Sequence, residues 1–318
     1  MKHFGQSLLA LSLVSLPLGA LLHAEDVAKK KIVFIHAGES HGYGGHSYGP
    51  AFRMFARILN ESVPSVTCKV IPENEDLTPM DSADAIVLGS DAGGLVKKLA
   101  SRLSPLMDKG VGLLCIHYTV DPGPKDACDN LIKWIGGAYV QNWSVNPSWE
   151  ADFKTFPDHP ISRGLKPFKL SDEWYYHMKF GDDKDDDVGL PVVKGLTPIL
   201  YAIPPERTRQ GKDGPHSGNA EVRKRTGKNE VLGWAFERAD GGRGFGCTGM
   251  HEHWGWAQDS FRKCILNAIV WIAKAEVPKD GVASKTMTLE DLEADLNKPR
   301  PANFNVQAMK DRIAKMNQ

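Results

Sequence analysis

The first half of this 318-residue chain alternates short apolar runs with amphipathic stretches, and that alternation constrains the fold more than any other feature. Residues 31–37 (Lys-Ile-Val-Phe-Ile-His-Ala) have the length and apolar character of a parallel strand that is buried on both faces. Further strands are predicted at 66–71, 85–88 and 111–117, and helices at 52–59, 95–107 and 126–135. Strands that alternate with helices predict a doubly wound, mainly parallel α/β sheet with right-handed crossovers.

The pattern changes between residues 143 and 239. Proline, glycine, aspartate and aromatic residues there separate short runs at 149–153, 198–203 and 231–237. Such runs are typical of antiparallel strands and long loops. We expect them to be added to the parallel sheet, so that residues 25–277 form one α/β domain.

Residues 278–318 form a polar tail after that domain. Its one patterned piece, with Leu289, Leu292 and Leu296 on one side, predicts a short amphipathic helix. This helix could pack on the body of the domain or on a partner. A second copy of the chain and a sugar oxidoreductase are both open as partners.

The first 24 residues have the features of a secretory signal peptide. A short basic start precedes an apolar run at 8–22, and Leu22-His23-Ala24 is a plausible cleavage site. The run is too short for a spanning helix, and no later segment is apolar for long enough to cross a bilayer. We therefore expect an exported protein, periplasmic or extracellular, with no membrane span after cleavage.

Charge and cysteine content exclude some functions. The chain has 39 Lys plus Arg and 39 Asp plus Glu, so no basic surplus favours nucleic acid as a partner. The five cysteines stand singly, without the paired spacing of a metal or redox motif. We interpret most of them as small core residues, with one disulfide left open.

Histidines follow three of the predicted strands. His41 and His46 lie after the first strand, His117 ends the fourth, and His251 and His253 follow a last predicted strand at 245–248. The loops at the carboxyl ends of neighbouring parallel strands converge on one crevice. Converging imidazoles suit either acid–base catalysis or a divalent metal such as Zn²⁺. We predict catalytic roles for His117 and His251, and a metal set of His46, His117 and His251 with His41 and His253 as alternates.

A structural role is the alternative for each of these histidines taken alone, because one at a strand end can simply hydrogen-bond a neighbouring carbonyl. We favour that interpretation for His36, inside the first strand, and for His159, beside a proline. His216 lies in a polar stretch and is expected to be solvated.

A second cluster of polar and aromatic residues occupies positions 171–177 (Ser-Asp-Glu-Trp-Tyr-Tyr-His). Carboxylates and phenols among aromatic faces are typical of a sugar pocket, although a strand packed into the core explains them equally well. On the first interpretation Glu173 is catalytic. The predicted substrate contacts are Asp172, Tyr175, Tyr176, His177, Trp254 and Arg243.

Two kinds of site are missing from the sequence. No Gly-x-Ser-x-Gly or Gly-x-Cys-x-Gly elbow is present, and Cys115 should be buried within its strand. The glycine loop at 42–45 lacks both the Lys-Ser/Thr end of a phosphate loop and the spacing of a dinucleotide fingerprint. No nucleotide cofactor is therefore expected.

Taken together, several motifs make the chain similar to the ThuA-like (trehalose utilisation) family. They are the Ser-His-Gly loop after the first strand, 112–117 (Gly-Leu-Leu-Cys-Ile-His), 158–165, 172–176, and Gly242-Arg243-Gly244 leading to Gly249-x-His251. The resemblance covers about residues 31–277 and implies a flavodoxin-like core of the class I glutamine amidotransferase-like superfamily.

The resemblance also implies carbohydrate metabolism, with trehalose-type disaccharides or their 3-keto derivatives as the substrate class. In glutamine amidotransferases a cysteine nucleophile follows the strand that here ends at His117, so glutamine hydrolysis is not expected. Two hypotheses remain. One is a histidine-based or metal-assisted hydrolase, lyase or isomerase acting on a small sugar, and the other is a non-catalytic periplasmic carbohydrate-binding or accessory module.

Overall fold

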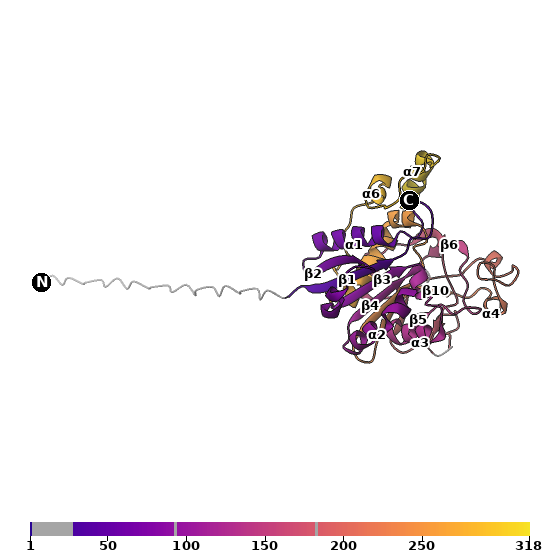
Figure 1. Cartoon of the computed structure of the whole chain (residues 1–318), viewed down its shortest axis with the longest axis horizontal. Coiled ribbons are helices and arrows are strands. Elements are labelled where there is room, and N and C mark those ends of the chain that lie inside the picture. Colours follow the sequence, from indigo (N-terminus) through magenta and orange to yellow (C-terminus); the bar gives the residue numbers. More distant parts are fainter. Residues whose placement is uncertain (2–27, 92–93, 182–183) are drawn as a thin grey trace.

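The computed structural model describes residues 1, 28–91, 94–181 and 184–318, and within them a central sheet runs through the molecule (Figure 1). Across the sheet the strands are β2 (Val66–Pro72), β1 (Lys30–Ala37), β3 (Ala85–Ser90), β4 (Gly112–Ile116), β11 (Arg243–Cys247), β10 (Glu230–Glu237) and β9 (Leu196–Ala202). The first five pair in parallel, whereas β10 is antiparallel to both of its neighbours. The predicted mainly parallel sheet with added antiparallel strands is confirmed.

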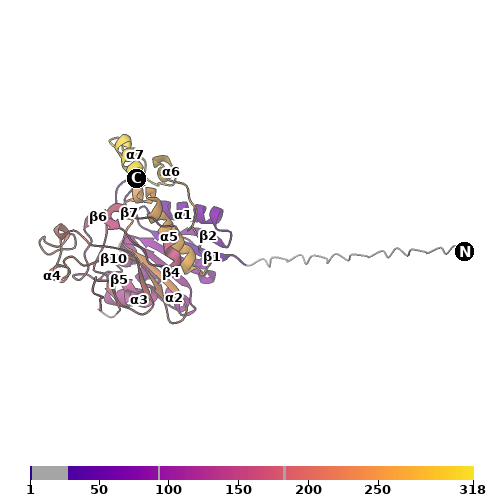
Figure 2. The ribbon, with the colours of Figure 1, turned by 180° about the vertical axis from the view of Figure 1, so that it is seen from behind.

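Helices cover both faces of this sheet (Figures 1 and 2). On one face lie α1 (Tyr48–Ser62) and α5 (Asp259–Ile272), and on the other α2 (Gly94–Asp108) and α3 (Lys125–Ile135). Within β1, Phe34 packs toward α1 and α5, while Val33 and Ile35 pack toward the opposite face. Neighbouring residues of a strand point to opposite faces, so an apolar run with no polar alternation fits a strand buried on both sides.

Outside the central sheet, the described residues form two small antiparallel pairs and several short helices. They are β6 (Ser148–Phe153) with β7 (Phe168–Glu173), β5 (Gly137–Ala138) with β8 (Lys179–Phe180), α4 (Ala220–Arg223), and the 3₁₀ turns η1 (Thr78–Ser82), η2 (His117–Val120), η3 (Pro160–Ser162), η4 (Glu206–Thr208) and η5 (His253–Ala257). The runs at 198–203 and 231–237 join the main sheet as β9 and β10. The run at 149–153 pairs with β7 instead, away from the main sheet.

The polar tail folds back onto the domain. It contains α6 (Leu289–Glu293), where a short helix was predicted, and also α7 (Val306–Lys315), which was not. Leu289 and Leu292 are buried against the core that contains α1, so this helix packs on the body of the domain. Figure 1 shows both tail helices on the α1 side of the sheet.

The structure describes the cysteines but not the predicted signal peptide. The predicted signal peptide falls on residues that, apart from Met1, lie outside the described part of the chain. All five cysteines are described and all are free thiols. None of the helices in the described segments has the length and apolar character that a bilayer crossing needs.

The strand order places the loops after β1, β3, β4 and β11 at one edge of the sheet. In a doubly wound sheet with the order 2-1-3-4-5, the chain leaves β1 and β3 in opposite directions, and ligands bind in the crevice at that switch point. The loops that carry His46 and His117 and the loop before His251 all open at this edge.

Candidate metal centre

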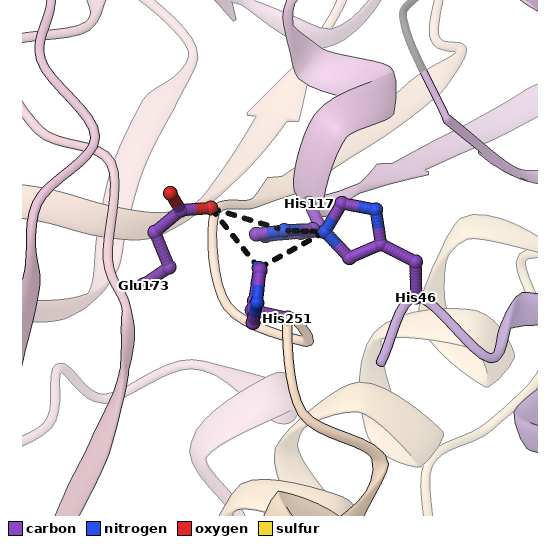
Figure 3. A group of neighbouring side chains, drawn as sticks. All are labelled: His46, His117, Glu173 and His251. Carbon is purple, nitrogen blue, oxygen red and sulfur yellow. Dashed lines mark hydrogen bonds and ion pairs between the residues drawn. The ribbon is translucent and has the colours of Figure 1, made fainter. Parts of the chain in front are cut away.

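Four side chains from distant parts of the chain converge at this edge, as Figure 3 shows. Their donor atoms all lie within 4.8 Å of one another: they belong to His46, His117, Glu173 and His251. His46 Nε2 is 3.0 Å from both His117 Nε2 and His251 Nδ1. The Glu173 carboxylate closes the group, with Oε2 3.1 Å from His251 Nδ1 and 3.6 Å from His117 Nε2.

The backbone that presents these side chains is strained. His46 (φ 46°), His117 (φ 51°) and Met250 (φ 104°) all have positive φ, which non-glycine residues rarely adopt. Such strain costs on the order of 1–3 kcal/mol per residue and persists where the surrounding structure holds it, often at functional sites. Three strained residues at one sheet edge therefore support a functional role for the cluster.

Asp172 holds the loop before His251 in place. This buried carboxylate accepts hydrogen bonds from the backbone N–H groups of Met250 (2.9 Å), His251 (3.0 Å) and Glu173 (2.7 Å). Burial raises its pKa to about 6. Asp172, which was predicted to contact substrate, lines the pocket beside the cluster, and its hydrogen bonds to the backbone orient the residues on either side of the site.

Hydrogen bonds at Nδ1 orient the rings of His46 and His117. His117 Nδ1 donates to the carbonyl oxygen of Thr248 at 2.7 Å, and His46 Nδ1 donates to Asp91 Oδ1. With hydrogen on both Nδ1 atoms, the Nε2 atoms of the two rings face each other across 3.0 Å. A proton or a metal ion shared between them would satisfy both nitrogens.

The spacing of the donor atoms fits a small tetrahedral metal. Four ligands at the usual Zn–N and Zn–O distances are about 3.3 Å apart. Four of the six separations in the cluster are 3.0, 3.0, 3.1 and 3.6 Å, and the other two do not exceed 4.8 Å. A carboxylate or carbonyl on the outer nitrogen is also the usual support of a metal-binding histidine. The residues present therefore fit a divalent metal such as Zn²⁺, with three imidazoles as ligands and Glu173 beside them.

Asp91 was not among the predicted site residues, although it follows β3 at the same edge. It accepts from His46 Nδ1 and from the backbone N–H of Ser40. These hydrogen bonds lower its pKa even though burial opposes the shift. Its position in the sequence could have identified it, because an acidic residue directly after a buried parallel strand lies at the same edge of the sheet as the histidines.

Replacing Asp91 with asparagine should weaken metal binding by about 10–100-fold, the usual cost of losing a carboxylate that supports a metal-binding ring. The amide would still accept from the ring of His46 but would carry no charge to make that ring a stronger ligand. Competition with a chromogenic chelator measures the change. Equal metal affinity in Asp91→Asn and wild type would contradict the assignment of His46 as a ligand.

The protonation behaviour of the histidines differs across the cluster. Burial and the neighbouring His46 hold the pKa of His117 well below its usual range, so the ring stays neutral. The hydrogen bond to Glu173 raises the pKa of His251 despite partial burial. A neutral ring is the form that binds metal, whereas the contact with Glu173 favours the protonated form of His251.

Of the aromatic residues predicted to contact substrate, Tyr175 reaches the cluster and Tyr176 does not. The Tyr175 hydroxyl lies 3.4 Å from His117 Nε2, and burial raises its pKa, so it remains a donor. Tyr176 points into the core and bonds Thr208 through its hydroxyl at 3.0 Å. Consecutive residues in extended chain point to opposite sides, which explains the split.

His177 and Trp254 also lie away from the four donor atoms. His177 stacks on Trp143, with ring centroids 4.5 Å apart, beside a separate pocket of about 200 Å³. Trp254 is buried against Tyr43 and Phe304 of the tail. Both were predicted to touch substrate, and neither reaches the cluster.

Arg243 is at the wrong end of its strand for a role in the site. It begins β11, whereas His251 follows the end of that strand, so the length of β11 separates them. Its guanidinium donates to the carbonyl oxygen of Trp271 at 3.0 Å and lies over the ring of that residue. Arg243, predicted to contact substrate, therefore lies away from the cluster and packs against Trp271 of α5.

Of the two histidines predicted as alternate metal ligands, His41 lies next to the cluster and His253 does not. His41 lies over the cluster, its ring centroid 3.7 Å from that of His46, and is exposed. His253 is buried elsewhere, with Nε2 3.0 Å from the carbonyl oxygen of Leu292 in α6. The 3₁₀ turn η5 begins at His253, so the extended geometry that would have put it beside His251 does not occur.

The three histidines assigned structural or solvated roles keep away from the four donor atoms. His36 is half-buried in β1, and His159 caps η3 by accepting from the backbone N–H of Ile161 at 3.1 Å. His216 is exposed and lies 3.6 Å from Glu173 Oε1, on the side of that carboxylate away from the rings. Of these three, only His216 approaches the site.

His253 should make the protein sensitive to acid. Burial lowers the pKa of His253 from the usual 6.5 to about 4. Between these two pH values the side chain is protonated in the unfolded chain and neutral in the folded one, which favours unfolding. Its contribution to stability is complete above pH 6.5 and is lost as the pH falls toward 4, about 2–3 kcal/mol at pH near 4.5. In His253→Asn, the difference between unfolding free energies measured in urea at about pH 7.5 and 4.5 should shrink by that amount. An unchanged difference would contradict this.

A pocket of about 310 Å³ opens beside the cluster and reaches it through Glu173 and His251. Its other walls include Ser148, Glu150, Ser171, Arg207, Glu252 and Arg312. A larger groove, about 1010 Å³, lies between the β6–β7 pair and the chain end but contains none of the four cluster residues. We assign the site to the smaller pocket because the converging donor atoms lie there.

The comparisons with known proteins agree with this fold. Residues 33–272 match the family model ThuA, described as trehalose utilisation. A ThuA-like protein from Bacteroides uniformis ATCC 8492 superposes with a TM-score of 0.53 at 13% identity, covering 80% of this chain and 95% of that one. Another from Parabacteroides merdae ATCC 43184 gives 0.50 at 14% identity, covering 81% and 96%.

Other comparisons add less. A GMP synthase-type protein from Thermoplasma acidophilum gives a TM-score of 0.38 at 15% identity, covering 77% of this chain and 94% of that one. No curated protein matches the chain. The family match is the informative one, because residues 33–272 run from β1 to the end of α5 and include the four converging side chains. The chain belongs to the ThuA family.

Proposed function

We propose that this protein is an exported, metal-dependent enzyme that acts on a small carbohydrate of the trehalose or keto-sugar type. The observation that carries the proposal is the pair of Nε2 atoms of His46 and His117, 3.0 Å apart, with His251 Nδ1 3.0 Å from the first of them. A divalent metal bound there would polarise an oxygen of the substrate. The family description, trehalose utilisation, supports the choice of substrate class.

The pocket beside the cluster suits a hydrophilic ligand of sugar size. Its volume of about 310 Å³ lies at the lower end of the range for small-molecule sites. Serine hydroxyls, carboxylates and two guanidinium groups line it, and these are the groups that hydrogen-bond sugar hydroxyls.

The residues of the chain divide the chemical work as follows. His46, His117 and His251 would hold the metal. Glu173, whose Oε2 lies 3.1 Å from His251 Nδ1 and which faces the pocket, would take a proton from the substrate or from water. Tyr175 keeps its proton and donates a hydrogen bond into the site.

Glutamine amidotransferase chemistry does not fit this arrangement. A histidine, His117, follows β4 where that superfamily places its nucleophile. Cys115 points into the core two residues earlier, and burial raises the pKa of its thiol far above neutrality. A buried protonated thiol is a poor nucleophile.

Metal analysis of the purified protein tests the proposal first. We expect about one equivalent of a divalent metal per chain, and turnover of a disaccharide or 3-keto-disaccharide that stops when the metal is removed and returns when it is restored. Tight sugar binding, seen as a thermal shift, without metal or turnover would instead favour a non-catalytic binding module. A protein that binds neither metal nor sugar would refute both the enzyme and the binding module.

A further inference from the structure

The tail segment 289–304 lies outside the family match but contacts the loop that carries His41 and His46. We propose that this segment is a brace that positions the 38–46 loop over the metal centre, with Lys298 as its main positioning residue. That the loop positions a metal ligand rests on the proposed function. The brace itself depends only on contacts between described residues.

Lys298 holds the loop by its backbone. Its ammonium group donates to the carbonyl oxygens of Glu39, at 3.2 Å, and of His41. The neighbouring Asn297 donates from Nδ2 to Glu39 Oε1 at 2.8 Å. Because these contacts reach two carbonyls two residues apart, they restrain the main chain of the loop and not merely one side chain.

A second set of contacts holds the middle of the loop. The Tyr43 hydroxyl donates to Glu293 Oε1, and Arg300 donates to both oxygens of the same carboxylate. The Tyr43 ring packs between Trp254 and Phe304, with centroid distances of 5.4 and 5.1 Å. The tail therefore contacts the loop through apolar surface as well as through hydrogen bonds.

The brace is itself fixed to the body of the domain. Arg53 of α1 donates to the carbonyl oxygen of Asp295 and to Asn297 Oδ1, both at 2.7 Å. Arg57 donates to Asp295 Oδ2 at 2.8 Å. A brace anchored on α1 can transmit rigidity to the loop, because the helix is packed against the sheet along one whole side.

Hydrogen bonds to the body of the domain hold the loop at Ser40, Gly44 and His46, and the brace adds to them because the loop's own sequence gives it little rigidity. It contains Gly38, Gly42, Gly44 and Gly45, which gain much conformational freedom when unrestrained. It must nevertheless hold His46 at a strained φ of 46° with Nε2 aimed at the cluster. A ligand carried on a mobile loop binds metal weakly, because ordering the loop then costs free energy at the binding step.

The test compares Lys298→Met with Lys263→Met, the matched control. Lys263 also donates from its ammonium group to a backbone carbonyl, that of Asp280 at 2.9 Å, and this contact lies outside both the brace and the 38–46 loop. Hydrogen exchange of the loop amides is measured on the metal-free full-length protein, and metal affinity by competition with a chelator. In Lys298→Met we expect loop exchange to rise and metal affinity to fall by roughly tenfold, the usual worth of one or two lost hydrogen bonds. Lys298→Arg should restore both.

The outcomes separate this inference from the proposed function. Unchanged loop exchange in Lys298→Met, or an equal effect in Lys263→Met, would overturn the brace. Faster exchange with unchanged metal affinity would overturn its role in positioning the site. A wild-type protein that binds no metal would refute the proposed function, while loop exchange would still decide whether the brace exists.

Discussion

Replacing His117 with alanine is expected to remove the bound metal and abolish turnover while the protein stays folded. The ring is fully buried, and its Nε2 atom lies 3.0 Å from His46 Nε2 and 3.6 Å from Glu173 Oε2. Losing one of three imidazole ligands should lower metal affinity by more than the roughly 100-fold that the loss of a supporting carboxylate can cost. Metal content by elemental analysis and turnover on the loaded protein measure both effects.

His159→Ala is the matched control for this variant. His159 is another partly buried ring, but it caps η3 by accepting from the backbone N–H of Ile161 at 3.1 Å and packs on Trp271 near the end of α5. It should lose some stability and keep its metal. Far-UV circular dichroism on both variants separates unfolding from loss of the site. Full metal content and wild-type turnover in folded His117→Ala would remove the metal centre as an explanation of function.

Glu173→Gln is expected to lower turnover by about 10²–10⁴-fold, the usual contribution of a positioned acid or base, while metal stays bound. The amide keeps the shape of the side chain and its contact with His251 but cannot carry the proton. Steady-state kinetics on metal-loaded protein and the metal affinity of the variant together measure this. The fall should appear in kcat, since the change removes proton transfer and not substrate binding.

Glu150→Gln provides the comparison for Glu173. Glu150 lines the same pocket but is not part of the four-residue cluster, so its loss should change KM and leave kcat within about tenfold. If Glu173→Gln lost metal as completely as His117→Ala, Glu173 would be a fourth ligand and not the proton carrier. The two roles are thus separated by one affinity measurement.

Much of the fold could be predicted from the sequence, because burial on both faces of a parallel strand leaves a strong signal. The apolar runs at 31–37, 85–88 and 111–117 became β1, β3 and β4, and the glycines after 135 end α3 in a left-handed cap. The end of β7 overlaps the strand that was left open at 171–177, but its start at Phe168 and its pairing with β6 in a small sheet outside the main one were not predicted.

The convergence of His46, His117 and His251 could also be predicted from the apolar runs that mark buried parallel strands. Once the strands are parallel, the ends of β1, β4 and β11 share one edge, and residues just beyond them must be near each other. Side-chain direction did not follow. Tyr175 and Tyr176 are adjacent in sequence, yet one reaches His117 and the other bonds Thr208 in the core.

The sequence by itself determined the class of sheet, the edge at which ligands gather and the three imidazoles that meet there, because burial and strand direction are written in its local pattern. Tertiary structure alone decided that Asp91 supports His46, that His253 turns away into α6, and that Lys298 contacts the loop from more than 250 positions along the chain. The physical reason is that loop conformation and long-range hydrogen bonds depend on packing between segments, which no local pattern encodes.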